Sequence, residues 1–166
     1  MTAAPQFSYE LIQPSARRRR WELQQGGEVR AVLEVPAFRP GARATFGDRQ
    51  WSFKRRGAIR AEHVVLDAGS REQLACVRPG RRRRRLEAGE LIAEWKRLPG
   101  AAGFGFVTDE GERLVSARLR AELMRSRGQI VVSKRVRERD AVMLALLAAY
   151  LLIRRGEEQT ASESAL

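Results

Sequence analysis

The residue types that most often carry chemistry in proteins are few in this chain of 166 residues. His63 is the only histidine and Cys76 is the only cysteine. A zinc site needs about three or four nitrogen, sulfur or oxygen ligands, which one histidine and one cysteine hardly supply. No serine lies in a nucleophile-elbow sequence, so a Ser-His-Asp triad has no signature here. We therefore expect a non-enzymatic protein with no metal and no cofactor.

His63 and Cys76 both fall in segments that alternate apolar and polar residues. We interpret His63 as a structural strand residue, and Cys76, which alternates with Leu74, as a small buried hydrophobe. The stretches GGE at 26–28 and GFGF at 103–106 lack the strand, glycine loop and helix order that cradles phosphate, and hairpin turns explain them.

Arginine is the one chemically active residue type that the chain has in excess. The chain has 32 Lys and Arg residues against 20 Asp and Glu residues, a formal net charge of +12. Such a charge attracts phosphate backbones, acidic lipid headgroups or acidic proteins. The basic residues form four clusters, three of which contain the candidate anion-binding residues; the fourth is the pair Arg154 and Arg155. The candidates are Arg17, Arg18, Arg19 and Arg20; Lys54, Arg55 and Arg56; and Arg81, Arg83 and Arg85.

The run of five arginines at 81–85 suggests a specific geometry. Because side chains alternate along a strand, at most three of the five can share one face. We expect Arg81, Arg83 and Arg85 to form an outward row, suited to bidentate contacts with phosphate.

Three interpretations of the basic surface remain open: anionic phospholipid headgroups at a membrane surface, nucleic acid, or no specific ligand, with the excess reflecting a coding bias toward arginine. Trp51, Phe53 and Trp95 lie on alternating strand faces and are expected in the core. They are therefore not expected to form stacking platforms between the arginines, which would have favoured nucleic acid. No feature of the sequence specifies an oligomeric state.

The single cysteine cannot form an internal disulfide, so no oxidising compartment is implied. The first 20 residues lack the apolar region and cleavage site of a secretory signal. We expect a cytoplasmic location, including peripheral attachment at the inner face of a membrane.

Short alternations of apolar and polar residues, broken by glycines, cover most of the chain from Trp21 to Arg135. Such alternation is typical of half-buried strands, and turn signals at intervals of about eight to twelve residues indicate consecutive antiparallel strands. The apolar faces are expected to contain Val29, Ala31, Leu33 and Val35; Trp51 and Phe53; Leu91, Ala93 and Trp95; Phe104 and Phe106; and Val115, Ala117 and Leu119.

Three of the predicted hairpins repeat at long range. The sequences LQQGGEVRAVL, LDAGSREQLACV and VTDEGERLVSARL carry Gly27, Gly69 and Gly111, spaced 42 residues apart. A fixed period of this size marks duplicated supersecondary units. Three units of about four strands predict roughly twelve strands, and a sheet that large tends to curl and close. A propeller is the rival architecture, but three blades fall below the usual four to eight or so.

One segment, Ala141 to Ile153, is apolar at all 13 positions. It is too short for a membrane span, which needs about 20 apolar residues, and a helix that is apolar on every side is typically surrounded by protein. A barrel of about twelve strands leaves a lumen that a helix could fill. We expect an all-β, closed antiparallel barrel over residues 1–155, wrapped around a hydrophobic C-terminal α-helix at about 137–155. Residues 156–166 are polar, small and acidic, and are expected to be a disordered tail.

The order of these parts resembles the tubby-like barrel superfamily, which includes the LURP-one-related proteins and the phospholipid scramblases. The hairpins WELQQGGEVRAV, VVLDAGSREQLACV and FVTDEGERLVSA, followed by AVMLALLAAYLLI, carry the resemblance over residues 7 to 155. It implies a twelve-stranded barrel around a central helix, and a protein that binds phospholipid headgroups through basic side chains. Only this resemblance ranks phospholipid above nucleic acid as the expected partner.

The calcium dependence of scramblases is not carried over to this chain. The segment SKRVRERDAV before the helix offers only Glu138 and Asp140 as carboxylates, whereas calcium takes about six to eight oxygen ligands.

Overall fold

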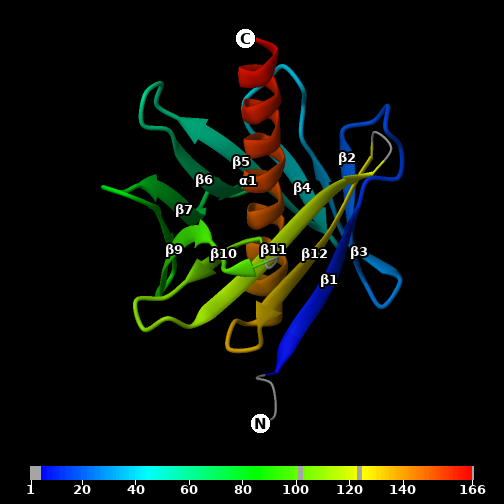
Figure 1. Ribbon diagram of the computed structural model, residues 1–166. Helices are drawn as coiled ribbons and strands as arrows, with labels where there is room; N and C mark the ends of the chain where they lie inside the picture. The colour runs from blue at the N-terminus through cyan, green and yellow to red at the C-terminus, as the bar shows by residue number, and fades with distance from the viewer. Residues whose placement is uncertain (1–4, 101–102, 123–124, 166) are drawn as a thin grey trace.

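The computed structural model describes residues 5–100, 103–122 and 125–165, with side chains not described at 121 and 122. The chain forms a closed barrel of twelve antiparallel strands around one helix, α1 (Glu138–Ser164), which confirms the predicted fold class (Figure 1). Each strand pairs with its neighbours in sequence, and β1 closes the barrel by pairing with β12. The strands are β1 (Gln6–Ile12), β2 (Arg20–Gln25), β3 (Glu28–Glu34), β4 (Ala42–Phe46), β5 (Arg49–Arg56), β6 (Glu62–Asp67), β7 (Gln73–Pro79), β8 (Arg84–Ala88), β9 (Leu91–Arg97), β10 (Phe104–Val107), β11 (Arg113–Glu122) and β12 (Arg125–Ser133).

The repeat seen in the sequence is visible in the barrel. Gly27, Gly69 and Gly111 lie in the turns of the hairpins β2–β3, β6–β7 and β10–β11. Each of these three hairpins also contains a register shift, which is the signature of a β-bulge. Two units are β2–β5 and β6–β9, and the third consists of β10–β12 with β1 as its fourth strand. The seven residue pairs between β1 and β12 thus join the two ends of the sheet.

The alternating apolar residues face the helix, as predicted, with one exception. Trp51, Phe53 and Phe106 belong to the same buried core as the helix. Val29 was expected beside Ala31 and Leu33 in the core, but 49% of its surface is exposed. It lies at the hairpin end of β3, next to the register shift in β2–β3.

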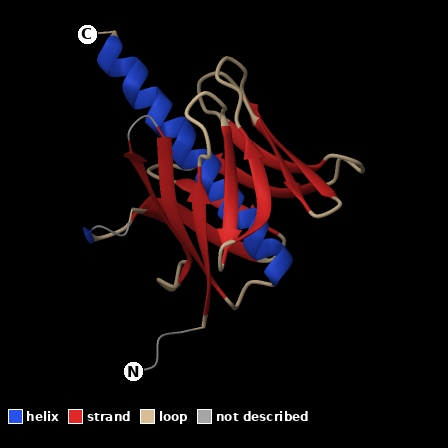
Figure 2. Ribbon diagram, turned by 90° about the vertical axis from the view of Figure 1, so that its right-hand side faces the viewer, coloured by secondary structure: helices blue, strands red, loops and turns tan. Residues whose placement is uncertain are grey.

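The apolar segment fills the barrel. Twelve of its 13 residues are buried, and Leu152 is half-buried. Figure 2 shows α1 passing through the ring of strands and projecting beyond it at its C-terminal end. No helix within the described residues is long and apolar enough to cross a membrane.

The expectation of a disordered tail at 156–166 is wrong for the described part, because α1 continues to Ser164 instead of ending near 155. Adding a residue to an existing helix is far easier than starting one, so the buried segment supplies the nucleus. Three hydroxyls in this extension each donate to the carbonyl four residues earlier: Thr160 to Gly156, Ser162 to Glu158 and Ser164 to Thr160.

Candidate anion-binding site

All the basic clusters lie at one end of the barrel. Because neighbouring strands alternate in direction, the loops β1–β2, β3–β4, β5–β6, β7–β8 and β9–β10 share the end from which the C-terminal half of α1 emerges (Figure 1). We call this end the C-terminal mouth, defined by these loops and by residues 150–158 of α1. Four clusters that are far apart in the sequence are therefore brought to one rim.

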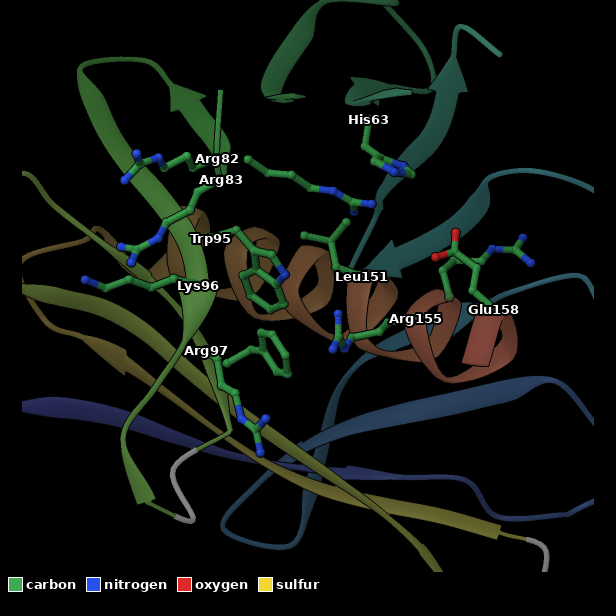
Figure 3. A pocket seen from close by; sticks show the side chains of 12 residues that line it. His63, Arg82, Arg83, Trp95, Lys96, Arg97, Leu151, Arg155 and Glu158 are labelled. Carbon is green, nitrogen blue, oxygen red and sulfur yellow. The ribbon is translucent and has the colours of Figure 1, made fainter. Parts of the chain in front are cut away.

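A cavity of about 370 Å³ opens at this mouth between α1 and strands β6, β8, β9 and β10. We call it the basic cavity, because seven of its twelve lining residues are arginine or lysine and only one is acidic (Figure 3). Its lining residues are His63, Arg82, Arg83, Arg84, Trp95, Lys96, Arg97, Phe104, Leu151, Arg154, Arg155 and Glu158.

An aromatic stack forms one wall of the basic cavity. Trp95 and Phe104 lie on the neighbouring strands β9 and β10, with ring centroids 5.7 Å apart and an interplanar angle of 19°. The guanidinium of Arg155 lies 4.5 Å from the centroid of the Phe104 ring, a cation–π contact that aims the side chain across the mouth. Figure 3 shows Arg155 pointing from the helix toward Trp95, whereas the side chains of Arg82, Arg83 and Lys96 point away from Trp95.

Several of these cations have no carboxylate partner in the part of the chain that the structure describes. Arg83 is paired with Glu94 at 3.5 Å, and Arg154 with Glu157 at 2.9 Å. Within the described residues, no carboxylate lies within ion-pair distance of Arg84, Arg97 or Arg155. Arg84, Arg97 and Arg155 line the basic cavity from two strands and the helix, each without a carboxylate partner among the described residues.

Arg154 plays a different part, since it holds the rim together. Its guanidinium donates to the carbonyl oxygens of Arg39 at 2.6 Å and Gly41 at 2.7 Å, both in the β3–β4 loop. The Arg154 guanidinium also lies 5.9 Å from the centroid of the Tyr150 ring. With its donors used in this way, Arg154 fixes the loop to the helix and adds positive potential at the cavity.

His63 is buried at the base of the mouth and behaves as a neutral group. Its Nδ1 is hydrogen-bonded to the Tyr150 hydroxyl at 3.1 Å. Burial, together with the positive charges of Arg84, Arg55 and Arg154, lowers the pKa of His63 to about 4. The structural role predicted for this residue is consistent with the hydrogen bond, but His63 also lines the basic cavity.

A second cavity, of about 380 Å³, adjoins the basic cavity and shares His63, Arg154 and Glu158 with it. We call it the adjoining cavity. Arg55 and residues 37–40 of the β3–β4 loop complete much of its lining. The two cavities together make a hollow around the emerging helix.

The predicted site residues divide into those the structure brings to the hollow and those it does not. Of the first cluster, Arg17, Arg18 and Arg20 are exposed. Arg19 is occupied instead, because its Nε donates to the Val35 carbonyl at 2.7 Å and its guanidinium pairs with Glu157. Arg19 is therefore not available as predicted.

In the second cluster the strand alternation of β5 separates the three residues. Arg55 continues the inward phase of Trp51 and Phe53 and reaches the adjoining cavity. Lys54 and Arg56 have the opposite phase, and both are exposed.

The predicted row of Arg81, Arg83 and Arg85 is not formed. Strand β8 begins only at Arg84, and residues 81–83 lie in the turn before it, where strand alternation does not apply. Arg84 has the inward phase of Leu86 and lines the basic cavity, whereas Arg85 has the outward phase.

Sequence reasoning missed Lys96 and Arg97 and did not place Arg154 and Arg155 among the site residues. A signal for Arg97 was present, because Phe53-Lys54-Arg55 and Trp95-Lys96-Arg97 are related by the 42-residue repeat. Arg55 and Arg97 are thus equivalent ends of inward-facing strands in two units.

Cys76 is buried as predicted, but in a small cluster with Val64 and Leu66, separate from the main core. Its thiol donates to a carboxylate oxygen of Glu62 at 2.7 Å. Burial and this carboxylate raise the pKa of Cys76 to about 11, so the thiol is protonated at neutral pH and is a poor nucleophile. Across the described ranges, no three His, Cys, Asp or Glu side chains are grouped so that they could hold a metal ion.

Comparisons with family models, curated proteins and solved structures found no match for this chain. The resemblance to tubby-like barrels therefore stays a prediction, and any function must be argued from the site itself.

Proposed function

We propose that this protein binds phosphorylated anionic headgroups at an acidic membrane surface through its C-terminal mouth, without catalysing a reaction. The observation that carries the proposal is the basic cavity, in which seven cationic side chains and one carboxylate line about 370 Å³. A hollow of this size suits a single small headgroup.

The chemistry of the lining favours phosphate over other anions. Guanidinium groups present planar forks of donors that match phosphate oxygens, and Arg84, Arg97 and Arg155 approach the cavity from different elements. Convergence from several sides distinguishes a tetrahedral, multiply charged anion from a flat carboxylate. The Trp95 and Phe104 rings supply an apolar wall for the uncharged part of a headgroup.

A double variant tests the proposal. Arg97→Ala with Arg155→Ala removes two cations from the basic cavity, whereas Arg49→Ala with Arg113→Ala removes two exposed cations from the opposite end of the barrel. We expect the first variant to bind inositol hexakisphosphate on the order of 30-fold more weakly by isothermal titration calorimetry, since each lysine or arginine at such a surface contributes about 1 kcal/mol. The second variant should lose less than about threefold, because its changes are distant and screened by salt.

The same pair of variants should rank alike in co-sedimentation with phosphatidylcholine vesicles that contain phosphatidylserine. Equal losses for both variants would mean that only net charge matters, and the mouth would not be a site. A single-stranded oligonucleotide serves as competitor. Preferential binding of the protein to the oligonucleotide would mean that the mouth binds nucleic acid and not lipid. Failure of the wild-type protein to co-sediment with acidic vesicles at low salt would contradict the proposal of membrane binding.

A further inference from the structure

Two large hydrophobic side chains stand almost fully in solvent. Phe38 is 100% exposed and Ile59 is 98% exposed, whereas Val29 and Ile92 are only about half exposed at 49% and 44%. A single exposed apolar residue is ordinary on a protein surface, so the exposure by itself means little. What sets Phe38 and Ile59 apart is their position on the barrel.

Both residues lie in loops of the C-terminal mouth. Phe38 belongs to the β3–β4 loop and Ile59 to the β5–β6 loop, and these are successive loops on the same rim (Figure 1). Phe38 also lines the adjoining cavity, which shares His63 and Arg154 with the basic cavity. Phe38 thus borders the hollow beside the basic cavity that we assign to the headgroup, and Ile59 lies on the next loop of the same rim, outside the lining of both cavities.

The loop that carries Phe38 is held in place. Arg154 donates to carbonyl oxygens on both sides of Pro40, those of Arg39 and Gly41. Gly41 has φ of +91°, and a Cβ there would come within 2.4 Å of the Phe53 carbonyl oxygen, so the loop joins β4 in a way that only glycine permits. Phe38 is therefore presented to solvent by a fixed framework.

Exposed arginines lie near both tips in the sequence. Arg39 follows Phe38 directly, and Arg56 and Arg60 flank Ile59, all three exposed. An apolar tip with arginines beside it is complementary to an acidic bilayer, where phosphates lie just above hydrocarbon. Apolar burial and attraction to anionic lipids then both contribute to binding. The net charge of +12 gives the attraction a favourable long-range part.

We infer that Phe38 and Ile59 insert into the interface of an acidic bilayer, so that the barrel docks with its C-terminal mouth toward the headgroups. The inference rests on the proposed function and adds the orientation of the protein and the apolar part of its contact. It assigns two roles to one rim: the arginines of the basic cavity hold a headgroup, and the loop tips anchor the rim beside it.

The test variant replaces both tips by serine, Phe38→Ser together with Ile59→Ser. The control variant, Val29→Ser together with Ile92→Ser, removes the two half-exposed apolar residues that lie away from the mouth. We expect the tip variant to co-sediment with phosphatidylserine-containing vesicles on the order of 30-fold more weakly at physiological salt. The control should bind the vesicles as the wild type does. Both variants should bind soluble inositol hexakisphosphate normally, since none of the four residues lines the basic cavity and no cation is removed.

Insertion also has a direct readout. A Phe38→Cys variant labelled with an environment-sensitive fluorophore should shift its emission to the blue on acidic vesicles, and a label at Asp48→Cys in the β4–β5 turn at the other end should not. Cys76 is buried and protonated, so it should not compete for the label.

The failures of the two proposals can be told apart. Vesicle binding that survives in the tip variant but is lost on removing Arg97 and Arg155 would overturn the docking inference and keep the headgroup site. Loss of soluble inositol hexakisphosphate binding in the tip variant would also overturn the inference, because the tips would then act on the site itself. A wild type that binds neither probe would end the proposed function.

Discussion

Replacing Leu147 by aspartate is expected to unfold the protein. Leu147 lies in the middle of the buried part of α1 and has no exposed surface. An unpaired charge at such a site costs several kcal/mol, which is comparable with the roughly 5–15 kcal/mol of total stability of a domain. Circular dichroism should show the loss of the cooperative thermal transition. Fractionation of the expressed protein should show a shift into the insoluble fraction.

Two further substitutions make this result specific to the barrel interior. Leu147→Ala should leave a folded protein that is less stable by about 2–5 kcal/mol, the usual range for deleting a buried leucine side chain. Gln159→Asp places the same charge on the exposed extension of α1 and should leave the melting temperature nearly unchanged. A Leu147→Asp protein that melts like the wild type would mean that α1 does not fill the barrel.

Acidification is expected to destabilise the protein by roughly 3 kcal/mol through His63 alone. The pKa of this side chain is about 4 in the folded protein against an ordinary value of 6.5, so the folded state favours the neutral ring. Above pH 6.5 neither state binds the proton and stability is complete. Between pH 6.5 and 4 only the unfolded state binds it, so stability falls by about 1.4 kcal/mol per pH unit and then levels off.

Urea denaturation between pH 7 and pH 4.5 measures this slope before most carboxylates titrate. His63→Gln keeps an amide that can hydrogen-bond Tyr150 but has no titrating ring, and it should remove most of the slope in this window. Retention of the full slope in that variant would show that other groups carry the pH dependence.

The same histidine reports on the proposed site. Arg55, Arg84 and Arg154 lower the pKa of His63, and Glu158 is the one carboxylate that lines both cavities. An anion bound in the hollow would offset the three positive charges and would thereby raise the pKa of His63. Because the chain has a single histidine, its ring resonance in a proton NMR titration is unambiguous. The pKa should rise when inositol hexakisphosphate is added to the wild type, and should respond much less in the Arg97→Ala, Arg155→Ala variant.

Several features of the fold follow from local properties of the chain. The 42-residue spacing of Gly27, Gly69 and Gly111 predicted the duplicated hairpins. Each hairpin is recognisable from sequence because its turn glycine and the flanking alternation of apolar and polar residues are adjacent in the chain. The length and all-round apolarity of Ala141 to Ile153 predicted a surrounded helix for a similar reason. The end of that helix was harder to predict, because a polar segment such as 156–164 becomes helical through the nucleus that precedes it.

The composition of the site was decided by the tertiary structure. By itself the sequence determined a closed, all-β barrel with a buried helix and a basic surface, since alternation, period and charge are local or summed quantities. Which arginines share a volume depends on where each strand begins and on its phase toward the barrel axis: β8 begins at Arg84, so the adjacent arginines at 81–83 lie in a turn. Arg84, Arg97 and Arg155 come together, and Arg19 is withdrawn by Glu157, only after the strands and helix have packed.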